Sequence, residues 1–315
     1  MIPVSSEFQA SSERIGRMVS KFKLRAKSKE SMIAYFLLLP FIGFYLLFTF
    51  YPLMQGFFIS FYEWNITSDK VFIGLDNYKE LFAEDAFWQA LRHTFLYVVF
   101  STPIFMFGAF LFAVIIDHKF IKGRALLRGV FFLPNVLAVS IVSIVWISIY
   151  QPYGGLLNNV LSLFGIEGSL AWLNDKNLVW PAITGLTFWW NTGYYMILYL
   201  AGLQEIPEDR YEAAQIDGAN GWHTLRYITL PSLKRIHVLV LFLQAVASFK
   251  IFGQVFLTSE GGPGGASRTY IQYIYESGFQ RFLMGKASAA AFVLFLVIML
   301  VSMLQLRLLK NVNED

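Results

Sequence analysis

The sequence predicts an all-α integral membrane protein with six transmembrane helices. Of its 315 residues, 56% are hydrophobic and 15% are charged, whereas about 25% of the residues of an ordinary soluble domain are charged. Six charge-poor stretches each approach or exceed the roughly 20 residues that a helix needs to cross a bilayer. They are Met32–Phe57, Thr94–Ile116, Gly129–Tyr150, Leu178–Gly202, Ile236–Thr258 and Ala287–Leu306. We therefore expect one transmembrane domain over residues 32–306, between an N-terminal segment, 1–31, and a tail, 307–315.

A basic segment precedes the first apolar stretch and favours its retention as a membrane helix. Residues 1–31 contain seven Lys and Arg, all between Arg14 and Lys29. Such a run beside an apolar helix is typical of a cytoplasmic anchor against anionic lipid, and nucleic-acid binding is the weaker alternative. The apolar stretch is also longer than the roughly 7–15 apolar residues of a signal peptide. We therefore expect membrane lipid, and no nucleic acid, among the partners.

The distribution of Lys and Arg predicts the orientation. With the N-terminus in the cytoplasm, the cytoplasmic segments hold 17 of the 25 Lys and Arg, the outer segments hold seven, and Lys250 lies within a span. Cytoplasmic loops of membrane proteins are enriched in these residues, so both termini and the loop 203–235 are predicted to be cytoplasmic. Prolines within the spans favour bent helices; they include Pro40, Pro52, Pro103 and Pro181.

No reactive constellation in the sequence supports an enzyme. The chain has no cysteine and no G-x-x-x-x-G-K-[ST] or G-x-S-x-G segment, which would cradle a nucleotide phosphate or present a nucleophile. Its four histidines lack the spacing of a metal site. None of the predicted spans contains an acidic residue, which proton-coupled pumps commonly use. We expect no catalytic residue, no metal and no cofactor bound by this chain, so it is either passive or driven by a partner.

Polar side chains inside spans four and five predict a solute pathway. They are spaced by three or four residues, which places each set on one helical face: Thr187, Trp190, Asn191 and Tyr194 in span four, and Gln244 and Ser248 in span five. An unpaired polar group in hydrocarbon costs several kcal/mol, so these faces should meet protein or a wet cavity. Aromatic planes beside amides and hydroxyls suit a sugar, whereas contact between packed helices is the alternative interpretation.

Lys250 is the one formal charge inside a predicted span. A lysine at the bilayer centre costs about 2.5–3.5 kcal/mol, so its ammonium should reach the surface, pair or face water. We expect it towards the outer side and turned away from the face of Gln244 and Ser248. Snorkelling or pairing with another subunit is the favoured interpretation, and contact with an acidic substrate is the alternative.

The polar loop 203–235, here called the coupling loop, predicts a helix–turn–helix. Helix-forming residues follow Pro207 and are interrupted by Asp217 and Gly218; glycine at such a break can adopt the left-handed conformation that closes a helix. A second short helix is expected to stop before Pro231. Small Ala213 and Ala214 should let another protein surface approach closely.

The same loop carries a family resemblance. Tyr211-Glu212-Ala213-Ala214, Asp217-Gly218-Ala219 and Ile228-Thr229-Leu230-Pro231 resemble the loop signature, or EAA motif, of permease subunits in binding-protein-dependent ATP-binding-cassette (ABC) importers. The chain is most similar to the carbohydrate-uptake type that includes the maltose and glycerol-phosphate permeases. Supporting segments are Phe132–Pro134, Leu200–Pro207 and Gly261–Pro263. The resemblance covers nearly the whole chain after about residue 30.

This resemblance implies the type I importer fold and a set of partners. A second homologous permease subunit, two copies of a cytoplasmic ATPase subunit that carry ATP and Mg²⁺, and an extracellular or periplasmic solute-binding protein are expected. The helix of Glu212–Asp217 would dock on the ATPase, and substrate-lining positions would fall on the polar faces of spans four and five. The implied location is a bacterial or archaeal plasma membrane.

Two interpretations from different functional classes follow. The first is the permease subunit of an importer for a sugar or oligosaccharide, with a polyol, glycerol-phosphate or acidic uronate saccharide as alternative substrates. The second is a self-contained channel or facilitator whose coupling loop is ordinary surface. Binding of an ATPase subunit through the loop would favour the first.

Overall fold

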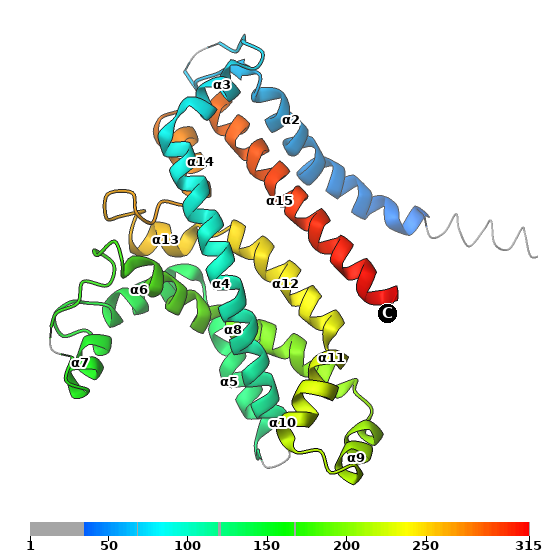
Figure 1. Ribbon diagram of the computed structural model, residues 1–315. Helices are drawn as coiled ribbons and strands as arrows, with labels where there is room; N and C mark the ends of the chain where they lie inside the picture. The colour runs from blue at the N-terminus through cyan, green and yellow to red at the C-terminus, as the bar shows by residue number, and fades with distance from the viewer. Residues whose placement is uncertain (1–34, 68, 119–120, 167, 315) are drawn as a thin grey trace, which may run out of the picture. The chain divides into compact units, whose positions relative to one another are not determined.

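A computed structural model describes residues 35–67, 69–118, 121–166 and 168–314 (Figure 1). The chain divides into two compact units, residues 1–58 and 59–315. In the first unit the described residues form one apolar helix, which contains the π-helical segment η1 (Leu46–Phe50) and continues into α2 (Tyr51–Ile59). The predicted start of span one, Met32, lies outside the described residues.

Three long helices form the centre of the second unit. They are α4 (Asp85–Asp117), α8 (Val179–Gln204) and α12 (Lys234–Phe249). Small residues on α4, such as Ala109 and Ala113, pack against buried Tyr199 and Leu200 of α8 and Val240 of α12. α15 (Met284–Glu314) packs against α12 through a second apolar cluster that includes Phe249 and Leu294. Spans two, four and six therefore fall within continuous helices, as the sequence predicts.

The described residues include several helices of membrane-spanning length. By length and composition, three helices of the described residues can cross a membrane, or up to five if each of two bent helix pairs is one span. The three are Tyr35–Ile59, Asp85–Asp117 and Met284–Arg307. α8 is a further 26-residue helix at the position of span four, with Trp, Tyr and Asn in its sequence. The total of six spans stays a prediction that is compatible with these helices.

The third predicted span is broken, which corrects the expectation of a continuous helix over Gly129–Tyr150. It consists of α5 (Arg124–Val136) and α6 (Val139–Ile149), which are bent by 99°. α5 continues past Pro134 to Val136, so the missing N–H of this proline does not by itself end the helix. Leu137 and Ala138 are extended. By contrast, α4 runs through Pro103 without a break.

The fifth predicted span, Ile236–Thr258, is also wrong as a continuous helix. α12 ends at Phe249, Lys250 caps it, and the short α13 (Gly253–Thr258) follows. α13 packs against α6, and a Cβ atom at Gly253 would lie 3.2 Å from a methyl group of Val139. The lack of a side chain at Gly253 therefore permits a close contact between the second halves of both broken spans.

Shorter elements gather at the two ends of the long helices of this unit (Figure 1). Near one end lie the antiparallel strands β1 (Tyr62–Glu63) and β2 (Val71–Phe72), α3 (Asp76–Ala83), α14 (Tyr270–Tyr275) and η3 (Glu276–Gln280). At the other end lie α9 (Glu208–Ile216) and α10 (Gly221–Thr224), followed by η2 (Leu225–Thr229) and α11 (Leu230–Ser232). α7 (Leu156–Leu163) lies in the segment between α6 and α8.

A charged cluster ties the strand-bearing end together. The Nζ atom of Lys286 lies 2.5 Å from Oε1 of Glu84, and the hydroxyl of Tyr273 donates to the other oxygen of Glu84. Lys286 is largely buried, so the carboxylate of Glu84 pairs with an ammonium group that has little contact with water. The cluster joins the start of α4 to α14 and α15.

The Glu84 cluster predicts a pH-dependent stability. Burial raises the pKa of Glu84, but the contacts with Lys286 and Tyr273 outweigh it and hold the pKa below its usual value. A carboxyl with a lowered pKa stabilises the fold above its unfolded pKa of about 4.3, and that stabilisation is lost as pH falls through the folded pKa. At neutral pH in detergent, the wild-type protein should have a higher melting temperature than Glu84→Gln. If the difference between the two melting temperatures does not narrow below about pH 4, the prediction is contradicted.

Among the glycines that face another helix in this unit, Gly193 of α8 lies closest to its neighbour. A Cβ atom there would lie 1.9 Å from the carbonyl oxygen of Phe131, a backbone atom of α5. Gly193→Ala should therefore lower the melting temperature in detergent, because overpacking typically costs about 1–3 kcal/mol. Gly129→Ala on α5 is the matched control, since its Cβ would meet nothing within 4 Å. Equal melting temperatures for the two variants would contradict the prediction.

Candidate functional site

The coupling loop contains the predicted break, with Gly218 in the predicted conformation. α9 ends at Ile216, and Gly218 has φ of +78°. The N–H of Ala219 donates to the carbonyl of Ala214, and the N–H of Gly218 donates to the carbonyl of Gln215. This pair of bonds is the Schellman motif, which closes a helix with a left-handed residue. The turn is therefore defined by backbone geometry, and a Cβ atom at Gly218 would meet nothing within 4 Å.

A second helical segment follows the turn and extends further than the sequence predicts. The Asn220 side chain accepts a hydrogen bond from the N–H of His223, which caps α10. Helical geometry then continues through η2 and α11 to Ser232. The expectation that it stops before Pro231 is wrong, because Pro231 lies within this continuous segment, directly after the π-helical turn η2 and Leu230.

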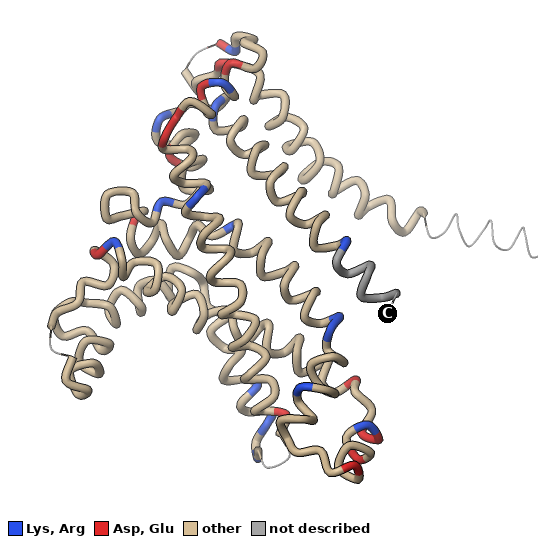
Figure 2. Tube along the Cα trace, viewed as in Figure 1, with Lys and Arg blue, Asp and Glu red and all other residues tan. Residues whose placement is uncertain are grey.

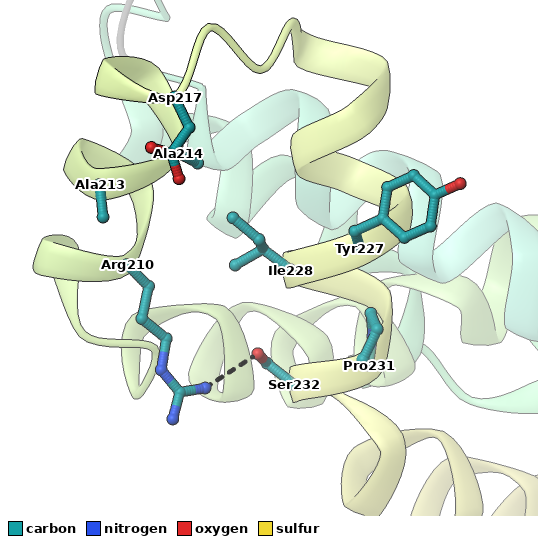
Figure 3. Close-up of a pocket in the computed structure, with 8 residues that line it drawn as sticks. All are labelled: Arg210, Ala213, Ala214, Asp217, Tyr227, Ile228, Pro231 and Ser232. Atoms are coloured by element: carbon teal, nitrogen blue, oxygen red, sulfur yellow. Dashed lines mark hydrogen bonds between the residues drawn. The ribbon is translucent and has the colours of Figure 1, made fainter.

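Two side-chain contacts link α9 to this second segment. Nη1 of Arg210 lies 3.3 Å from Oγ of Ser232, and the hydroxyl of Tyr211 lies 3.3 Å from Oγ1 of Thr229. Between the segments lies an open cavity of about 510 Å³, here called the coupling pocket. Figure 3 shows Ile228 pointing from the second segment towards α9, with Arg210 bridging to Ser232. The full lining is Arg210, Ala213, Ala214, Asp217, Tyr227, Ile228, Pro231 and Ser232.

The coupling loop also exposes large apolar side chains. Ile216, Trp222 and Tyr227 are 86%, 64% and 67% exposed. Glu212 and Ala213 are also exposed, whereas Ala214 is largely buried within the loop. Ala213, and not Ala214, is therefore the small residue open to an approaching surface. The three apolar side chains on a polar loop were not singled out from the sequence, although their residue types could have indicated them.

Two of the predicted pathway residues meet at the break in the third span. Nε1 of Trp190 donates to the carbonyl oxygen of Leu137 at 3.2 Å, and the Asn191 side chain accepts from Nδ2 of Asn135 at 3.2 Å. Leu137 is the C-cap residue of α5. Trp190 of α8 therefore supplies an N–H donor to a backbone carbonyl that a continuous helix would have satisfied. Asn135 was not predicted, although it follows Phe132–Pro134 directly.

The other predicted pathway residues are placed differently. Thr187 is buried and donates to the carbonyl of Ile183, whereas Tyr194 is 40% exposed. Gln244 and Ser248 are both buried and lie 3.0 Å apart, and Ser248 lies 3.2 Å from Oγ of Ser101 on α4. Gln244 and Ser248 thus form a polar contact that reaches from α12 to α4 through Ser101. Among the described residues, the Oε1 atom of Gln244 has no hydrogen-bond partner.

Lys250 lies at the end of a helix and not within one. It is the C-cap of α12, and it is exposed, while neighbouring Phe249 and Ile251 are buried. A cation at a helix C-terminus interacts favourably with the helix dipole. This interaction is worth about 0.3–1 kcal/mol, which offsets a fraction of the cost of a lysine at the bilayer centre.

Charged residues are concentrated at the ends of the second unit (Figure 2). Lys, Arg, Asp and Glu gather around α3 and α14 at one end and around α9 and α10 at the other, and the long helices between them carry few. This arrangement is typical of helices that cross a bilayer.

Comparison with known proteins identifies the family. Residues 81–314, which include both pathway helices and the coupling loop, match the family described as "Binding-protein-dependent transport system inner membrane component". The chain belongs to this family. The permease is 33% identical over 291 residues to the probable ABC transporter permease protein YurN of Bacillus subtilis, covering 91% of this chain and 99% of YurN.

Two further relatives extend the comparison. The arabinooligosaccharides transport system permease protein AraP of Halalkalibacterium halodurans is 32% identical over 283 residues, and the match covers 89% of each of the two chains. A crystal structure of a bacterial ABC transporter involved in the import of the acidic polysaccharide alginate contains a chain that is 25% identical, with a TM-score of 0.80. The match covers 92% of the permease and 99% of the chain in that crystal structure. The fold is thus that of an ABC importer permease, a multi-pass membrane component.

Proposed function

We propose that the permease forms half of the translocation pathway of an ATP-driven importer for a sugar or oligosaccharide. The other half is a second homologous permease subunit. Two copies of a cytoplasmic ATPase subunit, with ATP and Mg²⁺, supply the energy, and an outer solute-binding protein delivers the substrate. In this arrangement both termini and the coupling loop face the cytoplasm, in agreement with the excess of Lys and Arg in those segments.

The single observation that carries this proposal is the surface of the coupling loop. A polar helix–turn–helix exposes Ile216, Trp222 and Tyr227 beside the acidic Glu212 and the open coupling pocket. Large apolar side chains rimmed by polar ones are typical of a protein-binding surface. An ATPase subunit that presents apolar groups and cations is the partner that this surface fits.

Force on α9 would reach the membrane helices along a short path. Arg210 and Tyr211 contact Ser232 and Thr229, which directly precede α12. α12 in turn packs against α4 and α15. Closure of the two ATPase subunits on ATP would move α9, and α12 would transmit that movement to the pathway. ATP hydrolysis would then reset the inward-facing state.

The substrate class is supported by the α8 face and by the relatives. Trp190 and Tyr194 offer aromatic planes, and Asn191 with Asn135 offers amide groups at the break in the third span. Such a set can stack on a sugar ring and bond its hydroxyls. Two relatives carry names that refer to arabinooligosaccharides and to alginate, an acidic polysaccharide. The exposed Lys250 would suit an acidic saccharide, and a polyol or glycerol-phosphate remains an alternative substrate.

Cross-linking tests the proposal, because the chain has no native cysteine. Ile216→Cys should form a disulfide with a cysteine on the co-purified ATPase subunit, since Ile216 is the most exposed large apolar residue of the loop. Phe164→Cys is the matched control, with 79% exposure on a segment predicted to be on the outer side. Uptake of substrate by the chain alone in liposomes without ATP, and no cross-link, would instead support a channel or facilitator.

A further inference from the structure

A second cavity, here called the rim pocket, lies beside the coupling pocket where α8 ends and α12 begins. Its volume is about 450 Å³. It is lined by the C-cap of α8, the first residues of α9, the end of α11 and the first turn of α12. Arg210 and Ser232 line both cavities. The rim pocket therefore lies between the coupling loop and the start of a membrane helix.

Positive charge dominates the lining of the rim pocket. Arg210, Lys234 and Arg235 contribute three cationic side chains, and Glu205 is the one acidic residue in the lining. Figure 2 shows Lys and Arg at the beginning of α12. A concave surface with one dominant sign of charge concentrates counter-ions of the opposite sign.

Helix termini of both polarities meet at the rim pocket. α8 and α11 end there, and α9 and α12 begin there. The N-terminal end of a helix is positive and the C-terminal end is negative, so the helix dipoles largely oppose one another. The cavity and its three cationic side chains therefore carry the inference, and they indicate an anionic ligand.

We propose that the rim pocket binds a phosphate-bearing anion, supplied by the headgroup of an anionic phospholipid. The source follows from the position at the cytoplasmic end of α8 and α12, which rests on the orientation in the proposed function. Basic pockets between membrane helices on the cytoplasmic side suit such headgroups. Free phosphate shares this chemistry, and the experiment below separates the two sources.

A bound headgroup would affect the coupling loop through Arg210. This residue belongs to α9, lies 3.3 Å from Ser232 and lines both cavities. A phosphate in the rim pocket would attract Arg210 towards the first turn of α12 and so restrain α9 against the membrane helix. Transfer of force from the loop to α12 would then depend on the anionic lipid content of the membrane.

Lipid binding to the full-length chain, purified with the subunits that co-purify, tests the proposal. Native mass spectrometry would follow titration with phosphatidylglycerol, with phosphatidylcholine, and with inorganic phosphate. The pocket variant Lys234→Gln/Arg235→Gln should weaken phosphatidylglycerol binding about ten-fold or more, because each cation near an anionic lipid changes affinity about five-fold. Phosphatidylcholine binding should not change.

The matched control removes the same charge elsewhere. Lys122→Gln/Arg307→Gln replaces two exposed cations in segments predicted to be cytoplasmic, outside the rim pocket. It should leave phosphatidylglycerol binding within about two-fold of wild type. The single variants Lys234→Gln and Arg235→Gln, each with a smaller expected loss, keep the test informative if the double variant does not fold.

Each outcome bears on the proposal. Selective loss of phosphatidylglycerol in the pocket variant supports a lipid site, and selective loss of inorganic phosphate binding supports a phosphate site filled from solution. Equal binding of both anions by wild type and pocket variant would overturn the proposal. Since the measurement needs neither ATP nor substrate, a failure of the uptake and cross-linking tests would leave its result unaffected.

Discussion

Gly218→Val is expected to abolish uptake while the chain still inserts into the membrane. Gly218 has φ of +78°, and a Cβ atom there would meet nothing within 4 Å. The cost is thus conformational: a left-handed residue other than glycine costs about 1–2 kcal/mol, and a β-branched one is a genuine outlier. The turn would relax to another geometry, and α9 would lose its set direction relative to α10. The measurement is ATP-dependent uptake beside the amount of chain in the membrane fraction.

Two variants separate backbone conformation from other effects at this turn. Gly218→Asn should retain most uptake, because asparagine tolerates the left-handed region. Gly221→Ala, at the start of α10, changes a glycine that also has open space around it but lies outside that region of φ. It should transport normally. Normal uptake by Gly218→Val would show that the direction of α9 does not matter for transport.

The sequence predicted the parts of this fold that depend on local chemistry. Long apolar runs at spans two, four and six form continuous helices because nothing within them stops helical hydrogen bonding, and Gly218 occupies the turn because glycine tolerates positive φ. The same reasoning missed the breaks in spans three and five. Their cause is tertiary: α6 and α13 pack together through the small Gly253, and α8 supplies Trp190 to the freed carbonyl of Leu137.

The candidate pathway shows the same limit of sequence reasoning. Helical spacing predicted that Trp190 and Asn191 share one face of α8, but it could not reveal that Leu137 is the partner of Trp190 and Asn135 the partner of Asn191. Spacing also grouped Gln244 with Ser248, yet their burial against Ser101 depends on how α12 packs on α4. Contacts between segments distant in sequence decide which polar face is open.

The coupling loop was predictable in its chemistry but not in its surface. Its motif gave the turn and the family, whereas the exposure of Ile216 and the burial of Ala214 depend on how the loop folds on itself. Pro231 was expected to end a helix because proline lacks an N–H. The structure instead continues the helical path past Pro231 to Ser232, with the π-helical turn η2 just before it, and spacing along the sequence does not reveal such a turn.

Trp190→Ala should reduce uptake about ten-fold or more at an unchanged level of protein in the membrane. Two effects add: the aromatic plane proposed to stack on the sugar is lost, and the carbonyl of Leu137 loses the indole N–H that lies 3.2 Å away. A hydrogen bond contributes about 0.5–1.5 kcal/mol and an aromatic stacking contact about as much, so together they reach the 1.4 kcal/mol that corresponds to a factor of ten. Initial uptake rates over a range of substrate concentrations would measure the loss.

Neighbouring variants divide this loss into its two sources. Trp190→Phe keeps an aromatic plane and removes the N–H, so the uptake that it retains reports on stacking; Asn191→Ala and Tyr194→Ala test the rest of the face. Trp189→Ala is the matched control, because Trp189 is 42% exposed and contacts Trp146 instead of the break at Leu137. Trp189→Ala should reduce uptake less than Trp190→Ala does. If Trp190→Ala, Asn191→Ala and Tyr194→Ala all transport as well as wild type, this face of α8 does not line the pathway, and the break in the third span serves packing alone.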